Sequence, residues 1–208
     1  MLGELLKRDP GINMRLVPHR YGWTHVYLDI GEDKLYFIIS CAMGHSFTDL
    51  LRTLYFLHPE NNDPEFNEDG LLDWWDGAVK IAKKSEFTWE EEGAFSHWVI
   101  ERAPTLDTDF NIKISIDICR DEAEHYEYNV RYQDFCYVVA RACTEALKRN
   151  GIYGYHYSIY DDDIHLRYLL FIKSVALDNF EARALTASVE NGWATSFEKE
   201  IELLTFDM

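Results

Sequence analysis

The sequence predicts an α+β fold, in which a mainly antiparallel sheet is built from two hairpin-plus-helix units and followed by a helical C-terminal third. A pair of strands with alternating apolar side chains precedes an amphipathic helix near residues 24–58 and again near residues 111–150. The last third instead spaces its apolar residues at helical intervals. This pattern suits a sheet covered by helices on one side.

The first unit opens with a β-hairpin. The segments "THVYLDIG" and "KLYFIISC" alternate in hydrophobicity, and the short polar link "EDK" joins them. In "SFTDLLRTLYFLHP", Ser46 and Asp49 resemble a capping box, the leucines keep helical spacing, and Pro59 ends the helix.

The loop "ENNDPEFNEDG" separates the two units. It is rich in Asn, Asp and Pro, which favour turns over regular structure. We expect a single α+β domain over 1–208, with possible sub-units 12–60 and 71–208 joined by this acidic loop near 60–70.

The second unit contains the clearest strand of the chain. The segments "EFTWEEEG" and "AFSHWVIERAP" flank a turn at Gly93, and "FNIKISIDICRD" then places its isoleucines on one face and Lys113, Ser115 and Asp117 on the other. "HYEYNVRY" returns antiparallel. The helix "QDFCYVVARACTEALKRNG" follows, with Asp134 as its expected cap and Gly151 at its end.

Three further segments fill the C-terminal third. "DDIHLRYLLFIKSVAL" is apolar around much of its circumference, which predicts a buried helix. "NFEARALTASVENG" has helical spacing. "TSFEKEIELLTF" fits a capped helix, although its apolar residues also alternate as in an edge strand.

Charge restricts the function more than any motif does. The chain carries 37 acidic and 20 basic side chains, a net charge of −17. Nucleic-acid binding depends on Lys and Arg, and anionic membranes repel acidic proteins, so we expect neither kind of partner. A basic protein would be attracted. The acidic excess also serves solubility, which is the simpler interpretation.

The expected location is the cytoplasm. No apolar run is long enough to span a bilayer, and "MLGELLKRDPG" lacks the features of a signal peptide. The four cysteines form no CxxC pair and fit reduced, buried thiols. The sequence contains no P-loop, GxSxG or dinucleotide fingerprint, and we expect no cofactor.

Two clusters are candidate partner-binding sites. The "TWEEEG" segment and the "YDDDIH" segment gather carboxylates, and the adjacent tryptophans of "LLDWWDG" lie beside a polar loop. An exposed Trp in an acidic rim is a plausible hot spot. Core packing of the tryptophans and helix capping by the aspartates are the structural alternatives. The candidate residues are Glu90, Glu91, Glu92, Trp74, Trp75, Asp161, Asp162 and Asp163.

A metal site is the alternative. If the hairpin turns at Gly93, Glu91 and His97 could face each other across it, and a carboxylate that orients an imidazole suits metal or general-base chemistry. An ordinary cross-strand pair explains the same pattern. The residues of this alternative site are His97, Glu91, Asp161, Asp163 and His165.

The order of strand pair, helix, and aromatic, Glu-rich hairpin, from "THVYLDIG" to "NIKISIDI", is similar in layout to small bacterial proteins of unknown function, and this implies no activity. We therefore expect a non-catalytic acidic binding protein of the cytosol, of which an immunity-type inhibitor of a basic partner is one form. The alternative is a metal-dependent, hydrolase-like enzyme that uses His and carboxylates.

Overall fold

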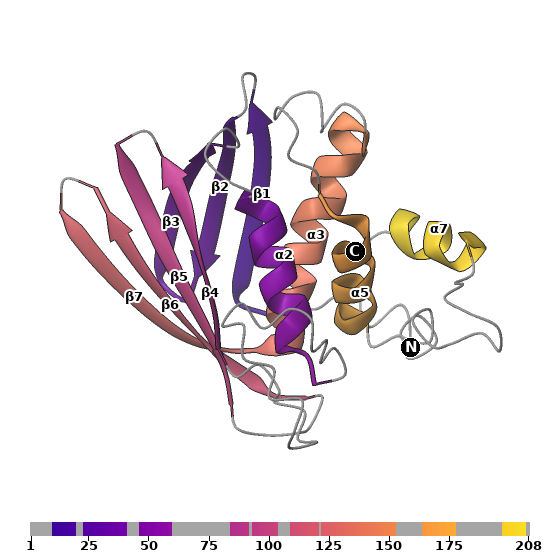
Figure 1. The fold of residues 1–208 in the computed structure, drawn as a ribbon. Helices are drawn as coiled ribbons and strands as arrows, with labels where there is room; N and C mark the ends of the chain where they lie inside the picture. The colour runs from indigo at the N-terminus through magenta and orange to yellow at the C-terminus, as the bar shows by residue number, and fades with distance from the viewer. Residues whose placement is uncertain are drawn as a thin grey trace, which may run out of the picture.

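The computed structural model describes residues 10–19, 23–40, 46–59, 84–91, 93–103, 109–120, 122–152, 164–177 and 197–206. These residues form two antiparallel sheets of three and four strands with helices packed beside them (Figure 1). The α+β class and the helix-rich C-terminal third predicted from the sequence are confirmed.

The three-stranded sheet has the order β1-β2-β3. Its strands are β1 (Ile12–His19), β2 (Trp23–Ile30) and β3 (Asp33–Ser40). The hairpin of β2 and β3 is the predicted one, and Gly31 enters its turn with φ +61°, a conformation that favours glycine. The sequence analysis missed β1, which contains Pro18 and pairs only with β2, as suits a proline on an edge strand.

The four-stranded sheet has the order β4-β5-β6-β7. Its strands are β4 (Lys84–Glu91), β5 (Ala94–Arg102), β6 (Asn111–Cys119) and β7 (Ala123–Arg131). Each strand pairs antiparallel with the next, and β3 also contacts β4. The strands predicted in this region are all present in this sheet, which is separate from the three-stranded sheet of the first unit.

Helices cover the inner side of the sheets. They are α2 (Ser46–Leu57), α3 (Tyr132–Asn150), α5 (Leu166–Ala176) and α7 (Phe197–Thr205). Helix α3 packs against β1, α2 packs against β4, and α5 packs on both helices (Figure 1). None of the helices in the described part of the chain is long and apolar enough to span a membrane.

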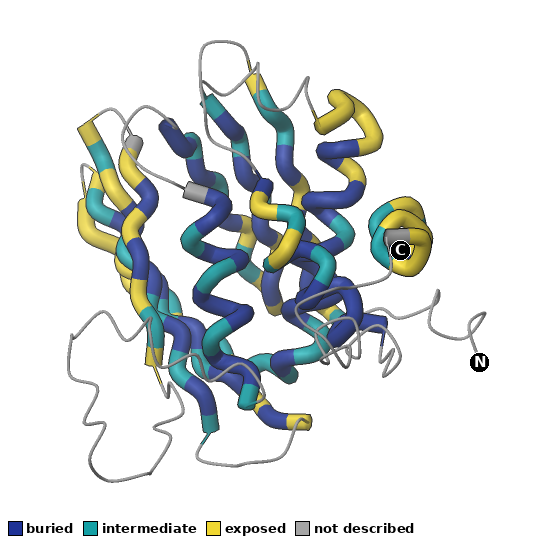
Figure 2. The backbone as a smooth tube through the Cα atoms, turned by 45° about the vertical axis from the view of Figure 1, so that its right-hand side comes forward, coloured by how far each residue is buried: buried dark blue, intermediate teal, exposed yellow. Residues whose placement is uncertain are grey.

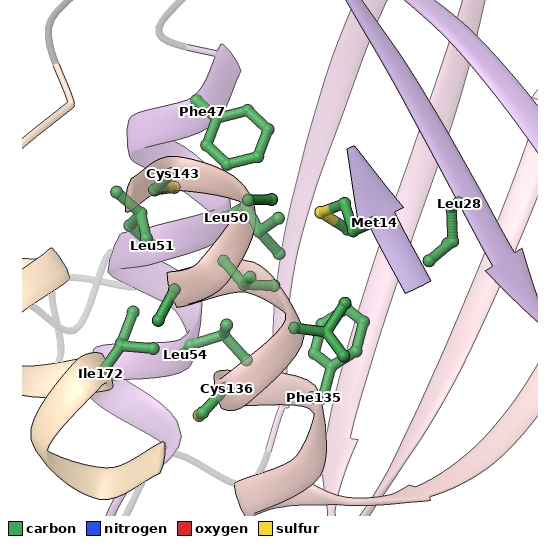
Figure 3. Packing of buried hydrophobic residues seen from close by; sticks show 14 of the residues in the cluster. Met14, Leu28, Phe47, Leu50, Leu51, Leu54, Phe135, Cys136, Cys143 and Ile172 are labelled. Atoms are coloured by element: carbon green, nitrogen blue, oxygen red, sulfur yellow. The ribbon is translucent and has the colours of Figure 1, made fainter. Parts of the chain in front are cut away.

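The main core lies between the sheets and α2, α3 and α5. Figure 3 shows Met14 of β1 and Leu28 of β2 facing leucines of α2 and Phe135 of α3. The inner face of the four-stranded sheet adds an aromatic cluster, in which the ring centroids of Trp89 and Trp98 lie 4.6 Å apart. Phe37 of β3 contacts both indoles, so the two sheets share this core.

Buried thiols occupy the middle of α3. Cys136 and Cys143 are free and fully buried, and burial raises the pKa of both. Cys119, at the end of β6, is also free and is partly buried. The three cysteines in the described ranges therefore agree with the expectation of reduced thiols.

Two predicted helix caps are wrong. Helix α3 has Arg131 as its N-cap, so Asp134 lies within its first turn. Helix α5 has His165 as its N-cap, without a side-chain capping bond. The buried residue Ile164 lies between the predicted aspartate caps and this N-cap. The aspartates of "YDDDIH" therefore precede the N-cap. In "TSFEKEIELLTF" the helical alternative is confirmed as α7.

Candidate functional site

The outer face of the four-stranded sheet is a solvent-facing surface built from four paired strands. Alternate residues of β5 and β6 are buried, and most of those between them are partly or fully exposed. The helices lie beside one side of this sheet (Figure 1), and Figure 2 shows the burial of each residue along the backbone. We use the name outer face for Lys84, Glu86, Thr88 and Glu90 of β4, Phe95, His97, Val99 and Glu101 of β5, Lys113, Ser115, Asp117 and Cys119 of β6, and Ala123, His125, Glu127 and Asn129 of β7.

A row of polar side chains crosses the middle of the outer face. The register places Thr88, His97, Asp117 and His125 side by side on the four strands. Thr88 Oγ1 lies 3.2 Å from His97 Nδ1, and His125 Nδ1 lies 2.6 Å from Asp117 Oδ1. The hydrogen bond to Asp117 is the main cause that raises the pKa of His125, and the charges of Asp117 and Glu127 act in the same direction.

Ion pairs neutralise several carboxylates of this face. Lys113 Nζ lies 2.5 Å from Glu127 Oε1, and Lys84 Nζ lies 3.2 Å from Glu86 Oε2. The hydrogen bond between Lys113 and Glu127 raises the pKa of the lysine and lowers that of the glutamate. These pairs are solvent-exposed, and such pairs contribute little to stability, so their main effect is to arrange charge.

Glu90 and Glu101 differ from the other carboxylates of the face. Glu90 is exposed and has no ion-pair partner among the described residues. Glu101 is partly buried and lies between Lys84 and Lys113 in the register, where its charge helps to raise the pKa of Lys113. The register places Glu90 directly opposite Phe95, which is itself opposite Cys119 on the other side. Phe95 is 45% exposed and is the aromatic residue among the large exposed apolar side chains of the described ranges. A free carboxylate thus lies beside an exposed aromatic ring.

The outer face of the three-stranded sheet is aromatic instead. The Tyr36 hydroxyl lies 2.6 Å from His25 Nδ1, and the Arg15 guanidinium lies 4.4 Å from the centre of the Tyr27 ring. Burial, followed by the charge of His19, lowers the pKa of His25. His25 and Tyr27 both contact Tyr36. The exposed carboxylate of this face, Asp29, accepts a hydrogen bond from Asn13 and lies opposite Lys34 in the register.

The predicted partner-binding residues are distributed unevenly. Glu90 lies on the outer face, and the backbone of Glu91 belongs to β4. The other predicted residues, Glu92, Trp74, Trp75, Asp161, Asp162 and Asp163, lie outside the described residues.

The predicted pairing of Glu91 with His97 does not occur in the register. Glu91 pairs with Ala94, and Thr88 pairs with His97. His165 is exposed at the start of α5, and its ring contacts Tyr168, in the helical layer rather than beside His97. Across the described ranges, no group of three or more His, Cys, Asp or Glu residues could hold a metal ion.

Most of the acidic excess belongs to residues outside the described ranges. The described residues carry 14 Lys and Arg against 18 Asp and Glu, a net charge of −4. The remaining residues carry 6 Lys and Arg against 19 Asp and Glu, a net charge of −13. Residues 60–83 alone contribute −5, so the charge is a property of particular segments and not of an evenly acidic surface.

Sequence reasoning missed two features of interest. The sequence analysis assigned Phe95 only to a strand. Phe95 occupies the same alternate positions as His97 and Glu101, and this could have marked it as outward-facing. Lys173 was hidden within an apolar helix, where it is fully buried. Lys173 is the one charged residue in "YLLFIKSVAL", and a lone charge in an apolar helix was the signal that could have marked it as buried.

Comparison with known proteins gave no match: no family model, no curated protein and no solved structure is significantly similar to this chain.

Proposed function

We propose that this protein is a non-catalytic acidic binding protein that engages a basic partner protein through the outer face of its four-stranded sheet. The observation that supports this most directly is the exposed ring of Phe95 opposite the free carboxylate of Glu90. Exposed aromatic residues with adjacent charge are typical of interface hot spots.

A basic side chain of the partner suits this pair. An arginine can stack its guanidinium on the phenyl ring while it donates hydrogen bonds to Glu90, and both contacts strengthen as water is excluded. Glu101 offers a second attachment on the same strand as Phe95. It lies six residues further along β5, about 20 Å away at 3.3 Å per residue.

The net charge of −17 supports the same partner chemistry. A field of one sign steers an oppositely charged protein and accelerates association, while contacts such as those at Phe95 determine how long the complex lasts. Because the acidic excess lies mainly outside the described fold, we expect it to affect the rate of association more than the contact geometry.

An immunity-type inhibitor of a basic protein, acting in the cytoplasm, is the specific role that we propose. Such a protein needs a rigid recognition surface and no catalytic group. A sheet face backed by a large core meets the first requirement.

The first test is capture of the partner. The protein is immobilised, a lysate of its source organism is applied at low salt, and bound proteins are eluted with rising salt. The proposal predicts one basic protein retained near one-to-one and eluted by salt, because screening weakens charge attraction. Retention that is the same at low and high ionic strength would contradict the electrostatic part of the proposal.

A further inference from the structure

The C-terminal helix α7 is attached through a small hydrophobic cluster of its own and through Leu204, which packs, partly buried, against the main core. Leu203 of α7 and Leu177 at the end of α5 form a second, small hydrophobic cluster, against which Leu170 and Phe206 pack. In the described part of the chain, these residues lie apart from the large cluster that holds the sheets, α2, α3 and α5 together.

Lys173 of α5 provides the polar part of this attachment. Its side chain is fully buried, and its Nζ donates hydrogen bonds to the carbonyl oxygens of Leu204 at 3.1 Å and Phe206 at 2.6 Å. These carbonyls lie at the end of α7, where a helix has unpaired acceptors and a partial negative charge. The ammonium therefore caps α7 from a neighbouring helix.

The cap has an energetic cost. No carboxylate forms an ion pair with Lys173 among the described residues, and the charged group that acts on it is Lys148 of α3, which repels it. Burial and then Lys148 lower the pKa of Lys173 to about 8. A buried ammonium that has lost its solvation and is repelled by Lys148 opposes the docked state, because solvation would be regained on exposure.

The remainder of α7 contributes little burial. Glu198, Lys199 and Glu202 are exposed, and Ile201 is 42% exposed, as the mostly exposed coil beside the C-terminal label in Figure 2 shows. Leu203 is the one residue of α7 that is buried among those whose side chains are described. Few apolar contacts and a solvated backbone are the properties of elements that open locally.

From these contacts we infer that α7 is a detachable latch, which opens by local unfolding while the sheets and α3 stay folded, and which uncovers a helix-binding seat on α5. The seat consists of Leu170, Lys173 and Leu177. Its occupant is the C-terminal end of α7, which supplies the apolar side chains of Leu203 and Phe206 and the two carbonyl acceptors. This latch lies on the helical side and is independent of the outer face.

Two readouts on the full chain test the latch. Hydrogen–deuterium exchange compares amides of α7 with those of α3, and a dilute amine-acetylating reagent measures how often Lys173 becomes accessible, because a buried amine reacts only from the open state. We expect α7 to exchange at least roughly 100-fold faster than the centre of α3. Sub-denaturing urea should accelerate exchange in α3 but leave exchange in α7 and acetylation of Lys173 nearly unchanged.

A matched pair of variants sharpens the test. Leu203→Ala removes the buried contact and should accelerate both α7 exchange and Lys173 acetylation by roughly 10-fold or more, with α3 unaffected. Glu202→Ala, at the exposed neighbouring position, should change both by less than about twofold. The inference is overturned if α7 exchange and Lys173 acetylation in the unmodified chain share the urea dependence of α3. Equal acceleration of α3 and α7 in Leu203→Ala would also overturn it.

Discussion

The two faces of the four-stranded sheet have the same backbone but different roles. On the inner face, Trp98 and Ile114 are fully buried against the aromatic core and the helices. On the outer face, Phe95 is exposed, Glu90 has no ion pair with the described residues, and His125 forms an exposed hydrogen bond with Asp117. Because side chains alternate along a strand, one set of residues can fix the fold while the other remains available for binding. Substitutions on the inner face should therefore lower stability, and substitutions on the outer face should lower the affinity for the partner.

The largest effect is expected on the inner face. Trp98→Ala removes an indole that contacts Trp89, Phe37 and Phe87, and the cavity should lower the free energy of unfolding by about 3–5 kcal/mol. Val99→Ala, the adjacent residue on the outer face, should lower it by about 1 kcal/mol or less. Urea unfolding followed by circular dichroism measures both. Equal losses would mean that the two faces do not differ in burial.

Phe95→Ala should weaken binding and leave stability nearly unchanged. Loss of the exposed ring should weaken binding of the captured partner by about 1–2 kcal/mol, roughly tenfold, with little change in the urea midpoint. Ile152→Ala is the matched control, since Ile152 is 49% exposed but lies at the helical side beyond α3. Titration calorimetry that shows the same loss for both variants would remove Phe95 from the interface.

Lys173 should make stability depend on pH in an alkaline window. Its pKa is lowered to about 8 in the folded protein, from 10.5 when unfolded, so between these values the unfolded chain binds more protons and stability rises with pH. The contribution should be about 1 kcal/mol between pH 7.5 and 9.5 after allowance for solvent screening. The measurement compares the rise in the free energy of unfolding between pH 7.5 and 9.5 in the unmodified chain with the rise in Lys173→Met. The rise should be larger in the unmodified chain. A difference of zero would contradict a buried charge at this position.

The smallest effect concerns His125. Its pKa is raised by Asp117, so protonation begins above the usual value of 6.5 and adds positive charge to the outer face as pH falls. Affinity for the basic partner should therefore decrease by about twofold from pH 8 to pH 6. Asp117→Asn should bring the His125 titration midpoint, followed by NMR, down toward 6.5. A midpoint that does not move would exclude Asp117 as the cause.

The fold was more predictable than the site, and single elements show why. The isoleucines of β6 alternate strictly, so the sequence predicted both its buried face and the outward position of Asp117. The register is not contained in the periodicity: β4 and β5 pair Glu91 with Ala94 and Thr88 with His97, so Glu91 does not face His97. Lys173 was missed because its acceptors, the carbonyls of Leu204 and Phe206, lie on a helix distant in sequence.

The central claim is that a basic partner binds the outer face of the four-stranded sheet. The most direct measurement compares two double charge reversals with equal change in net charge, by calorimetry with the captured partner. Glu90→Lys with Glu101→Lys alters the outer face, whereas Glu145→Lys with Glu202→Lys alters exposed positions on α3 and α7. The account predicts that the first pair weakens binding by about 2 kcal/mol or more, roughly 30-fold, and that the second weakens it less than about threefold. Equal weakening by both pairs would show that total charge, and not this face, selects the partner.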